Sequence, residues 1–258
     1  MKYKGGKQML GKHLAKFIKE STINLDVEGY LEPFCGSLGV LIHMTDTFDC
    51  TAADYHPDLI EMWKAVQDNS FKPPVKVSEE DYLKIKQTSS PSALKGFVGF
   101  GCSFGGQFFG GYAQKYANGK KEDFLKEATH SINKKRPVIK DVDFYNASYE
   151  ELEPNNMLIY CDPPYEFTKF PVKYRRDVKH YDLFDNKSFW EKMREWSKNN
   201  IVFISEVKAP DDFVSVWEKQ SHRSISQSQK TRYKSDDTKT FKTERLFVHA
   251  DTVKKIKM

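Results

Sequence analysis

A glycine-rich loop between two short apolar segments constrains the fold of this chain more than any other feature. Residues 30–32 predict a strand that runs into Glu32-Pro33-Phe34-Cys35-Gly36-Ser37-Leu38-Gly39. An apolar helix is expected at about 38–44, and 50–54 predicts a second strand that ends in an acid, Asp54. This order forms a βαβ unit, which is typical of open α/β sheets that bind nucleotide-like ligands at the carboxyl ends of their strands.

The residues of this βαβ unit restrict the class of ligand that it could bind. An acid after the second strand is placed to bond ribose hydroxyls, although an aspartate there also serves as a turn or cap residue. The loop lacks the complete Gly-x-Gly-x-x-Gly pattern, and no Gly-Lys-Ser/Thr follows it. Neither a dinucleotide fingerprint nor a phosphate-binding P-loop is therefore supported.

A second apolar run, residues 157–160, stops at Asp162-Pro163-Pro164-Tyr165. A proline pair cannot continue a strand ladder, so the strand must end there, with a carboxylate and an aromatic ring in fixed relation. At the carboxyl end of a strand in an open parallel sheet, this arrangement makes a site. Taken alone, the same four residues are equally well explained as a turn.

The rest of the chain continues the α/β pattern on both sides of an unusual middle region. Helices are expected from 57 onward, at 79–86, 122–133 and 186–197, and from 210 to 217; strands are expected at 138–144, 201–205 and 244–249. Residues 95–112 interleave glycines with aromatic residues, and we expect neither helix nor strand there. This stretch either presents rings to nucleobases or is a tightly packed loop. We expect one catalytic domain, 1–70 and 138–258, with an inserted subdomain at 71–137.

Charge and cysteine usage exclude several classes. The net charge of +5 is compatible with a polyanionic partner. Four cysteines stand at 35, 50, 102 and 161 without a Cys-x-x-Cys pair, and the histidines show no ligand spacing, so we expect neither a disulfide framework nor a metal site. No apolar run approaches the ~20 residues of a membrane span. These features fit a cytoplasmic protein with no membrane partner.

Three motifs in order resemble the Dam-like DNA adenine-N6 methyltransferases. Tyr3-Lys4-Gly5-Gly6-Lys7 is similar to their N-terminal signature, the 32–39 segment to their cofactor loop, and Asp162-Pro163-Pro164-Tyr165 to their catalytic motif. Asp54 matches the acid after their second strand. The matches run from residue 3 to about 206. Lys4 departs from the family, which often carries Pro or Ala there, and this difference should change loop stiffness more than chemistry.

The resemblance implies a Rossmann-like S-adenosylmethionine-dependent methyltransferase sheet, mostly parallel with one antiparallel strand, and an inserted target-recognition subdomain. It implies transfer of a methyl group from S-adenosyl-L-methionine to the N6 amine of a flipped adenine in double-stranded DNA. The expected catalytic residues are Asp162, Pro163, Pro164 and Tyr165. The expected cofactor-binding residues are Tyr3, Lys7, Glu32, Pro33, Phe34, Cys35, Gly36, Ser37, Gly39, Asp54, Tyr55, Ser148 and Asp162. The expected DNA-binding residues are Lys95, Phe104, Gln107, Tyr112, Lys115, Lys134, Lys135, Arg136, Lys173, Arg175 and Arg176.

The residues support this chemistry independently. The Asp162 carboxylate and the Pro163 carbonyl form an acceptor pair for both N–H groups of an exocyclic amine, which favours a pyramidal nitrogen with its lone pair aimed at a methyl donor. Tyr165 supplies a face on which a flipped base stacks. A cytosine-N4 or RNA-directed enzyme, a catalytically silent DNA-binding protein and, less favoured, a nicotinamide dehydrogenase remain as alternatives. The recognition sequence, the biological role and the choice between monomer and weak dimer stay open.

Overall fold

The computed structural model describes residues 1–113, 116–117, 120–121, 123–164, 184–224 and 239–257. The side chains of 116–117, 120–121, 221–224 and 239–242 are not described. The predictions for Lys115, Tyr165, Lys173, Arg175 and Arg176 therefore lie outside the described residues.

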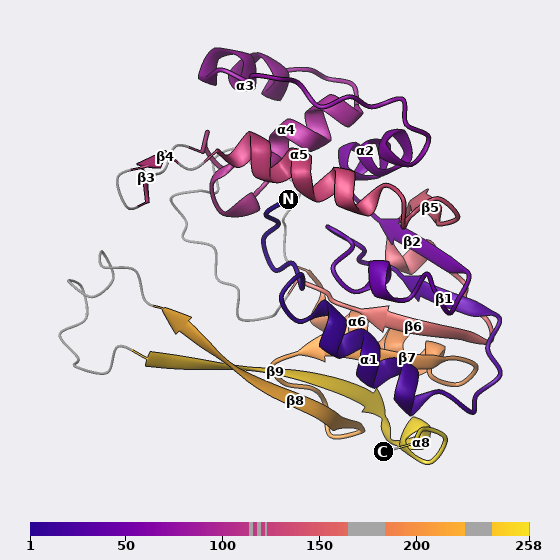
Figure 1. Ribbon diagram of the computed structural model, residues 1–258. Helices are drawn as coiled ribbons and strands as arrows, with labels where there is room; N and C mark the ends of the chain where they lie inside the picture. The colour runs from indigo at the N-terminus through magenta and orange to yellow at the C-terminus, as the bar shows by residue number, and fades with distance from the viewer. Residues whose placement is uncertain (114–115, 118–119, 122, 165–183, 225–238, 258) are drawn as a thin grey trace.

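A seven-stranded sheet forms the centre of the described chain (Figure 1). In spatial order the strands are β5 (Asp143–Asn146), β2 (Cys50–Asp54), β1 (Gly29–Glu32), β6 (Met157–Cys161), β7 (Ile201–Glu206), β9 (Lys239–His249) and β8 (Phe213–Ser224). β1 pairs in parallel with β2 and β6, β2 with β5, and β6 with β7. Within this sheet β9 alone runs against the others, because it is antiparallel to both β7 and β8. This confirms the predicted Rossmann-like sheet with one antiparallel strand.

Helices cover both faces of the sheet, and alternate strand residues enter two separate cores. Tyr160 and Phe203 pack into the larger core, which also contains side chains of α1 (Gly11–Ser21) and α2 (Pro57–Gln67). Ile159 and Val202 point to the opposite face and pack with α6 (Asn186–Trp196). Burial on both faces explains why these central strands read as continuous apolar runs in the sequence.

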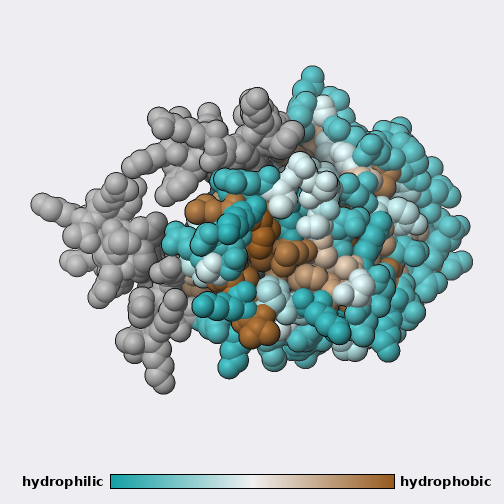
Figure 2. All heavy atoms as spheres, turned by 90° about the horizontal axis from the view of Figure 1, so that it is seen from above, coloured by the Kyte–Doolittle hydropathy of each residue, from teal (hydrophilic) through white to brown (hydrophobic). Residues whose placement is uncertain are grey.

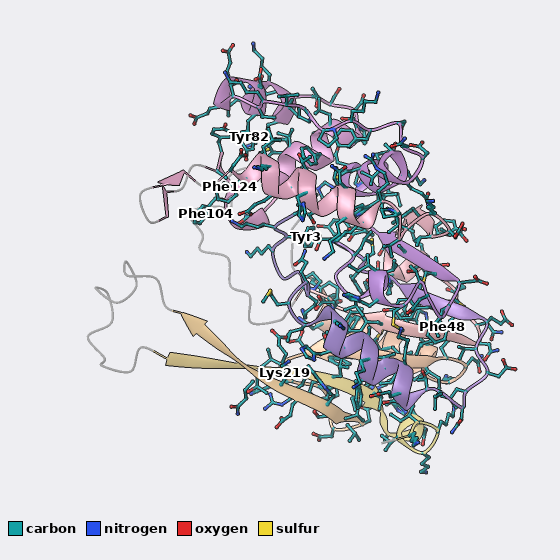
Figure 3. All side chains as sticks on the ribbon, viewed as in Figure 1. Tyr3, Phe48, Tyr82, Phe104, Phe124 and Lys219 are labelled. Carbon is teal, nitrogen blue, oxygen red and sulfur yellow. The ribbon has the colours of Figure 1, made fainter. Side chains whose placement is uncertain are left out.

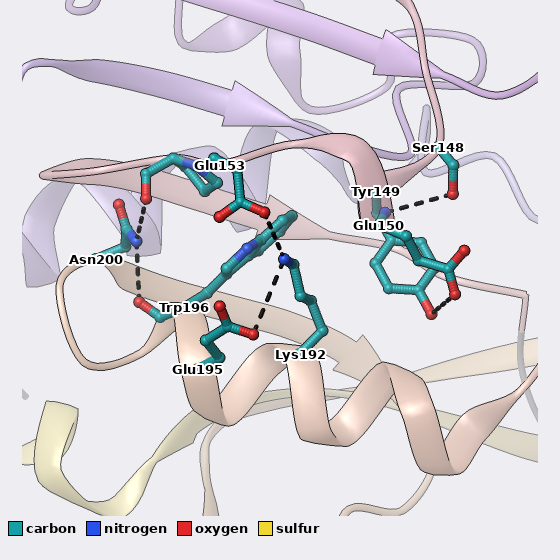
Figure 4. Close-up of polar contacts among 9 residues, drawn as sticks. Ser148, Tyr149, Glu150, Glu153, Lys192, Glu195, Trp196 and Asn200 are labelled. Atoms are coloured by element: carbon teal, nitrogen blue, oxygen red, sulfur yellow. Dashed lines mark hydrogen bonds and ion pairs between the residues drawn. The ribbon is translucent and has the colours of Figure 1, made fainter.

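Polar contacts fix the start of β6, and hence the position at which this strand ends (Figure 4). The Asn200 side chain accepts a bond from the Met157 N–H at 2.9 Å and donates to the Pro154 carbonyl at 3.0 Å. On α6, the Lys192 ammonium pairs with Glu153 at 2.9 Å. The segment before β6, which includes η3 (Tyr149–Glu151), is therefore fastened to α6 and to the start of β7.

Residues 71–137 contain α3 (Glu79–Lys86), α4 (Ala93–Gly101) and α5 (Phe124–Lys135). α4 packs against α2, and α3 and α5 pack against α4. Phe97 and Ile132 from this segment share the larger core with Trp63 of α2. A short antiparallel pair, β3 (Tyr116–Ala117) and β4 (Lys120–Lys121), lies between α4 and α5 in the chain. Seen from above, this side of the molecule is mostly hydrophilic, with some apolar side chains between the polar ones (Figure 2).

The helix α4 corrects the expectation that residues 95–112 contain no regular structure. Its glycines are close-packing residues: a Cβ at Gly96 would lie 2.1 Å from the Asp58 carbonyl oxygen, and one at Gly99 would lie 2.4 Å from the Phe108 ring. The helix also has an N-cap, because the Ser92 hydroxyl accepts a bond from the Lys95 N–H at 3.2 Å. After α4 the chain forms a tight turn, η2 (Phe104–Gly106).

Three further expectations differ from the structure. The helix expected at 38–44 is only a 3-10 turn, η1 (Leu41–His43). The segment 210–217 enters strand β8, which pairs with β9. The strand expected at 138–144 begins at Asp143. The chain ends in the short helix α8 (Ala250–Val253). No described helix is both long and apolar enough to cross a membrane.

Candidate active site

The carboxyl ends of three neighbouring parallel strands bring the predicted acids to one edge of the sheet. β1 ends at Glu32, β2 ends at Asp54, and Asp162 follows β6. The chain leaves β1 towards β2 but leaves β6 towards β7, so the strand order reverses between β1 and β6. Such a switch point opens a ligand-binding crevice at the carboxyl ends of the strands.

Asp162 is held by a lysine from the N-terminal segment. The Lys7 ammonium lies 2.6 Å from Asp162 Oδ1 and 3.2 Å from the Gly5 carbonyl oxygen, and the Lys7 side chain is 7% exposed. The following Pro163 is buried and Pro164 is exposed. The resemblance assigned Lys7 to the cofactor, whereas the structure brings its ammonium to the predicted catalytic acid.

The glycine loop is fixed by side chains from several parts of the chain. Gly36 has a φ of +45°, and a Cβ there would lie 2.9 Å from the Tyr3 ring, so this position requires glycine. The Trp63 indole N–H donates to the Gly36 carbonyl at 2.9 Å. The Gln8 amide donates to the Ser37 hydroxyl, and the Lys135 ammonium donates to the Ser37 carbonyl. The loop is therefore a rigid part of the site.

Asp54 connects the loop to the second strand. Its carboxylate accepts bonds from the Gly36 N–H and the His56 N–H, both at 3.0 Å. Burial raises the pKa of Asp54 to about 6, although both N–H donors act to lower it. The turn role of this aspartate is thus real, and its role towards a ribose remains a prediction.

Glu32 is a second buried acid at this edge. It is 2% exposed and accepts a bond from the Tyr30 hydroxyl at 2.7 Å. Burial, with the nearby Asp162 acting in the same direction, raises the pKa of the Glu32 carboxyl to about 8, although the bond from Tyr30 acts to lower it. A neutral acid in this position becomes a carboxylate readily when a cation binds beside it.

The other predicted cofactor residues lie around this edge, with different surroundings. Tyr55 is 45% exposed and lies edge-on to His56, at 6.2 Å between ring centroids. Phe34 packs on Tyr149 at 5.2 Å, and Cys35 is buried. Ser148 forms a capping box with Glu151 at η3, which gives it a local structural role.

The predicted DNA-binding residues divide into exposed and internally bonded side chains. Phe104, labelled in Figure 3, lies on η2 and is 62% exposed, and Lys134 is also exposed. Gln107 is half-buried. The Tyr112 hydroxyl donates to Val77 at 2.6 Å, and the Lys95 ammonium donates to Thr88 at 2.5 Å.

Two members of the basic cluster at 134–136 are used within the protein. Lys135 is 4% exposed, so the structure argues against its predicted contact with DNA. Helical periodicity explains the difference, because consecutive side chains in a helix point about 100° apart, so Lys135 is buried while Lys134 is exposed. The Arg136 guanidinium donates to the Asn69 side chain at 2.7 Å and to the Phe71 carbonyl at 3.1 Å.

Sequence reasoning missed several residues that shape the site. Trp63 and Gln8 bond the glycine loop but belong to no motif that we recognised. His56 lies 4.2 Å from Phe108 and 5.0 Å from Phe100 between ring centroids, and burial lowers its pKa to about 4. The Pro57 that follows His56 predicted the helix start, but nothing predicted the aromatic surroundings of the histidine.

The fold and the site define a class of protein. A mostly parallel sheet with a rigid glycine loop, an acid on the second strand and Asp-Pro-Pro at the switch point is the arrangement of a Rossmann-like methyltransferase. Residues 3–92 match the family model of the D12 class N6 adenine-specific DNA methyltransferases, which is consistent with a Dam-like adenine methyltransferase. The match includes the N-terminal signature, the glycine loop and Asp54, and it ends before Asp162. Methylation of adenine in DNA is the activity that the family indicates. No curated protein matches the chain significantly.

Proposed function

We propose that this protein transfers the methyl group of S-adenosyl-L-methionine to N6 of an adenine flipped out of double-stranded DNA. The observation that carries the proposal is the position of Asp162. It follows β6 at the switch point of the sheet, where the neighbouring strand β1 ends in Glu32 and runs into the glycine loop.

The residues present fit the cofactor. Its ammonium and sulfonium groups are cations and its ribose carries two hydroxyls, and Glu32, Asp54 and Asp162 place acids at the ends of three neighbouring strands. Glycine at position 36 leaves no Cβ between the loop and Tyr3. When bound, the cofactor supplies an electrophilic methyl group on its sulfonium. We propose that Asp54 accepts from the ribose hydroxyls, and that Glu32 and the loop hold the amino-acid end.

Asp162 and Pro163 prepare the nucleophile. An aromatic exocyclic amine is a poor nucleophile because its lone pair is delocalised into the ring. Hydrogen bonds from its two N–H groups to the Asp162 carboxylate and the Pro163 carbonyl favour a pyramidal nitrogen. A carboxylate paired with an ammonium accepts hydrogen bonds and donates none, and its two oxygens have lone pairs for more than one donor. The 2.6 Å contact to Lys7 therefore orients Asp162 without excluding an amine.

We also propose that the segment 71–137 contacts the DNA. Phe104 is exposed on η2, and the backbone of this turn is bonded to the N-terminal segment through the Lys4 N–H and the Gly106 carbonyl at 3.2 Å. The N-terminal segment in turn carries Lys7 to Asp162. The exposed ring and the exposed Lys134 suit stacking on bases and contact with phosphates, respectively.

Methyl transfer from labelled S-adenosylmethionine to duplex DNA of mixed sequence tests the proposal. The wild type should label DNA, and mass spectrometry of the digested product should find N6-methyladenine. Asp162→Ala should abolish the label, and Asp211→Ala, an exposed aspartate, should not. N4-methylcytosine, or label on RNA alone, would identify a different amine acceptor. DNA binding without label would identify a silent DNA-binding protein.

A further inference from the structure

The last residue of α5 is a buried lysine that contacts the glycine loop. The Lys135 side chain is 4% exposed, and its ammonium donates to the Ser37 carbonyl. The same ammonium lies 5.4 Å from the centroid of the Trp63 ring, whose own N–H is bonded to the Gly36 carbonyl. Two consecutive carbonyls of the loop are therefore held by side chains from α5 and α2.

A lysine in this position is expensive for folding. Burial lowers the pKa of its ammonium to about 8. Burying a charged group is unfavourable unless its hydrogen bonds are satisfied. A leucine or methionine would fill the space without that penalty, and the neighbouring Lys134 remains in solvent. The buried charge thus calls for a role that a nonpolar side chain cannot perform.

The loop contains backbone strain that such a contact offsets. Leu38, which follows Ser37, is a non-glycine residue with a φ of 59° and is fully buried. Left-handed backbone at such a residue costs about 1–3 kcal/mol and persists only where neighbouring contacts over-determine it. The Lys135 contact to the Ser37 carbonyl fixes the peptide that joins Ser37 to Leu38.

We infer that Lys135 is a positioning residue for the cofactor loop: by holding the Ser37 carbonyl, it keeps residues 36–39 in the binding conformation and sets cofactor affinity. This inference rests on the proposed function, because it takes the loop to be the cofactor site. Lys135 does not touch the reacting atoms in this assignment. Its loss therefore weakens cofactor binding and leaves methyl transfer at saturating cofactor nearly unchanged.

The test compares Lys135→Met with Lys126→Met, the same substitution at an exposed lysine on the same helix. Each variant is titrated with S-adenosylmethionine and with S-adenosylhomocysteine. The change in tryptophan fluorescence during each titration gives the cofactor Kd. We expect Lys135→Met to raise the Kd at least about ten-fold, the effect of losing one charged hydrogen bond. We expect kcat at saturating cofactor to stay within about two-fold. We expect Lys126→Met to match the wild type, and Lys135→Arg, which keeps the cation, to restore part of the affinity.

Other results would overturn the inference. An unchanged Kd in Lys135→Met would remove the positioning role. A fall in kcat equal to the rise in Kd, with a lowered Tm of the ligand-free protein, would make Lys135 a general structural residue. Failure of both Lys135→Met and Lys135→Leu to fold, under conditions where Lys135→Arg folds, would lead to the same conclusion. The proposed function fails separately, in the wild type, if it neither binds the cofactor nor labels DNA.

Discussion

Replacing Glu32 by glutamine should stabilise the ligand-free protein at neutral pH. Glu32 is 2% exposed, its ordinary pKa is 4.5, and burial raises that pKa to about 8 in the folded protein. Between these two values the folded state keeps a proton that the unfolded state has released. The free energy of unfolding therefore falls as pH rises through this window. Glutamine is neutral at every pH and keeps an oxygen that accepts the bond from Tyr30.

The size of the effect follows from the two pKa values. Each unit of pH between them changes the unfolding free energy by about 1.4 kcal/mol, so at pH 7 the glutamate destabilises the fold by roughly 3 kcal/mol. At pH 5 the same group costs less than about 1 kcal/mol, because the unfolded carboxyl is partly protonated there. Glutamine brings two N–H donors into a buried site, and burying them lowers the free energy of unfolding by about 1 kcal/mol. We expect a net gain of about 2 kcal/mol at pH 7 and almost none at pH 5.

Urea unfolding of the ligand-free protein, followed by tryptophan fluorescence at both pH values, measures this difference. Asp54, whose pKa is raised to about 6, adds a slope at lower pH in both proteins, so it cancels in the comparison. A gain that is equal at pH 5 and pH 7 would show that Glu32 does not titrate in this window. A loss of stability at pH 7 would show that the buried carboxylate is compensated by a contact stronger than those described.

The remaining predictions concern the catalytic acid, the packing of α4 and the DNA surface. Lys7→Met should lower kcat at least about ten-fold, with a smaller change in the cofactor Kd, because Asp162 loses its charged partner. A raised cofactor Kd with unchanged kcat would instead support the cofactor-binding role that the resemblance implies for Lys7. Gly96→Ala should lower the free energy of unfolding in urea by more than about 3 kcal/mol, because its Cβ would lie 2.1 Å from the Asp58 carbonyl oxygen. Ala93→Gly on the same helix should lower it by only about 1 kcal/mol, and similar losses in the two variants would refute this packing. Phe104→Ala should raise the KM for duplex DNA without changing cofactor Kd or Tm, because the ring is 62% exposed; an unchanged KM would place the DNA elsewhere.

The parts of the fold that the sequence predicted well are those where local pattern and tertiary environment agree. The strand at 50–54, the helix at 79–86 and the strand at 201–205 lie where the sequence predicts them, and the helix begins at a capping box on Ser78. The prediction for the glycine-rich stretch at 95–112 was wrong because local pattern and tertiary environment disagree there. Its glycines lower helix propensity, but close packing of α4 on α2 decides the outcome, and no pattern within the stretch itself reveals that contact.

The prediction for the first part of β8 was wrong because this strand is formed by non-local pairing with β9. We expected a helix at 210–217, yet Val214 pairs with Val248, far along the chain. In contrast, the motifs correctly predicted that Glu32, Asp54 and Asp162 lie at one edge of the sheet, because parallel strands have their carboxyl ends at the same edge. They did not predict which cation meets which acid. The burial of Lys135 was equally invisible, because it depends on the direction in which the last turn of α5 faces.

One segment near the N-terminus joins the parts of the site that lie far apart in the sequence. Tyr3 packs against Gly36, Gln8 bonds Ser37, and Lys7 holds Asp162. The same segment is bonded at Lys4 to the turn that exposes Phe104. The two glycines between Tyr3 and Lys7 let the chain turn back on itself, with Gly5 at a φ of +81°. We therefore expect a displacement of the Phe104 turn by DNA to reach residues 36–39 and Asp162 through this bonded segment. This connection gives a physical reason for a Tyr-x-Gly-Gly-Lys signature outside the sheet.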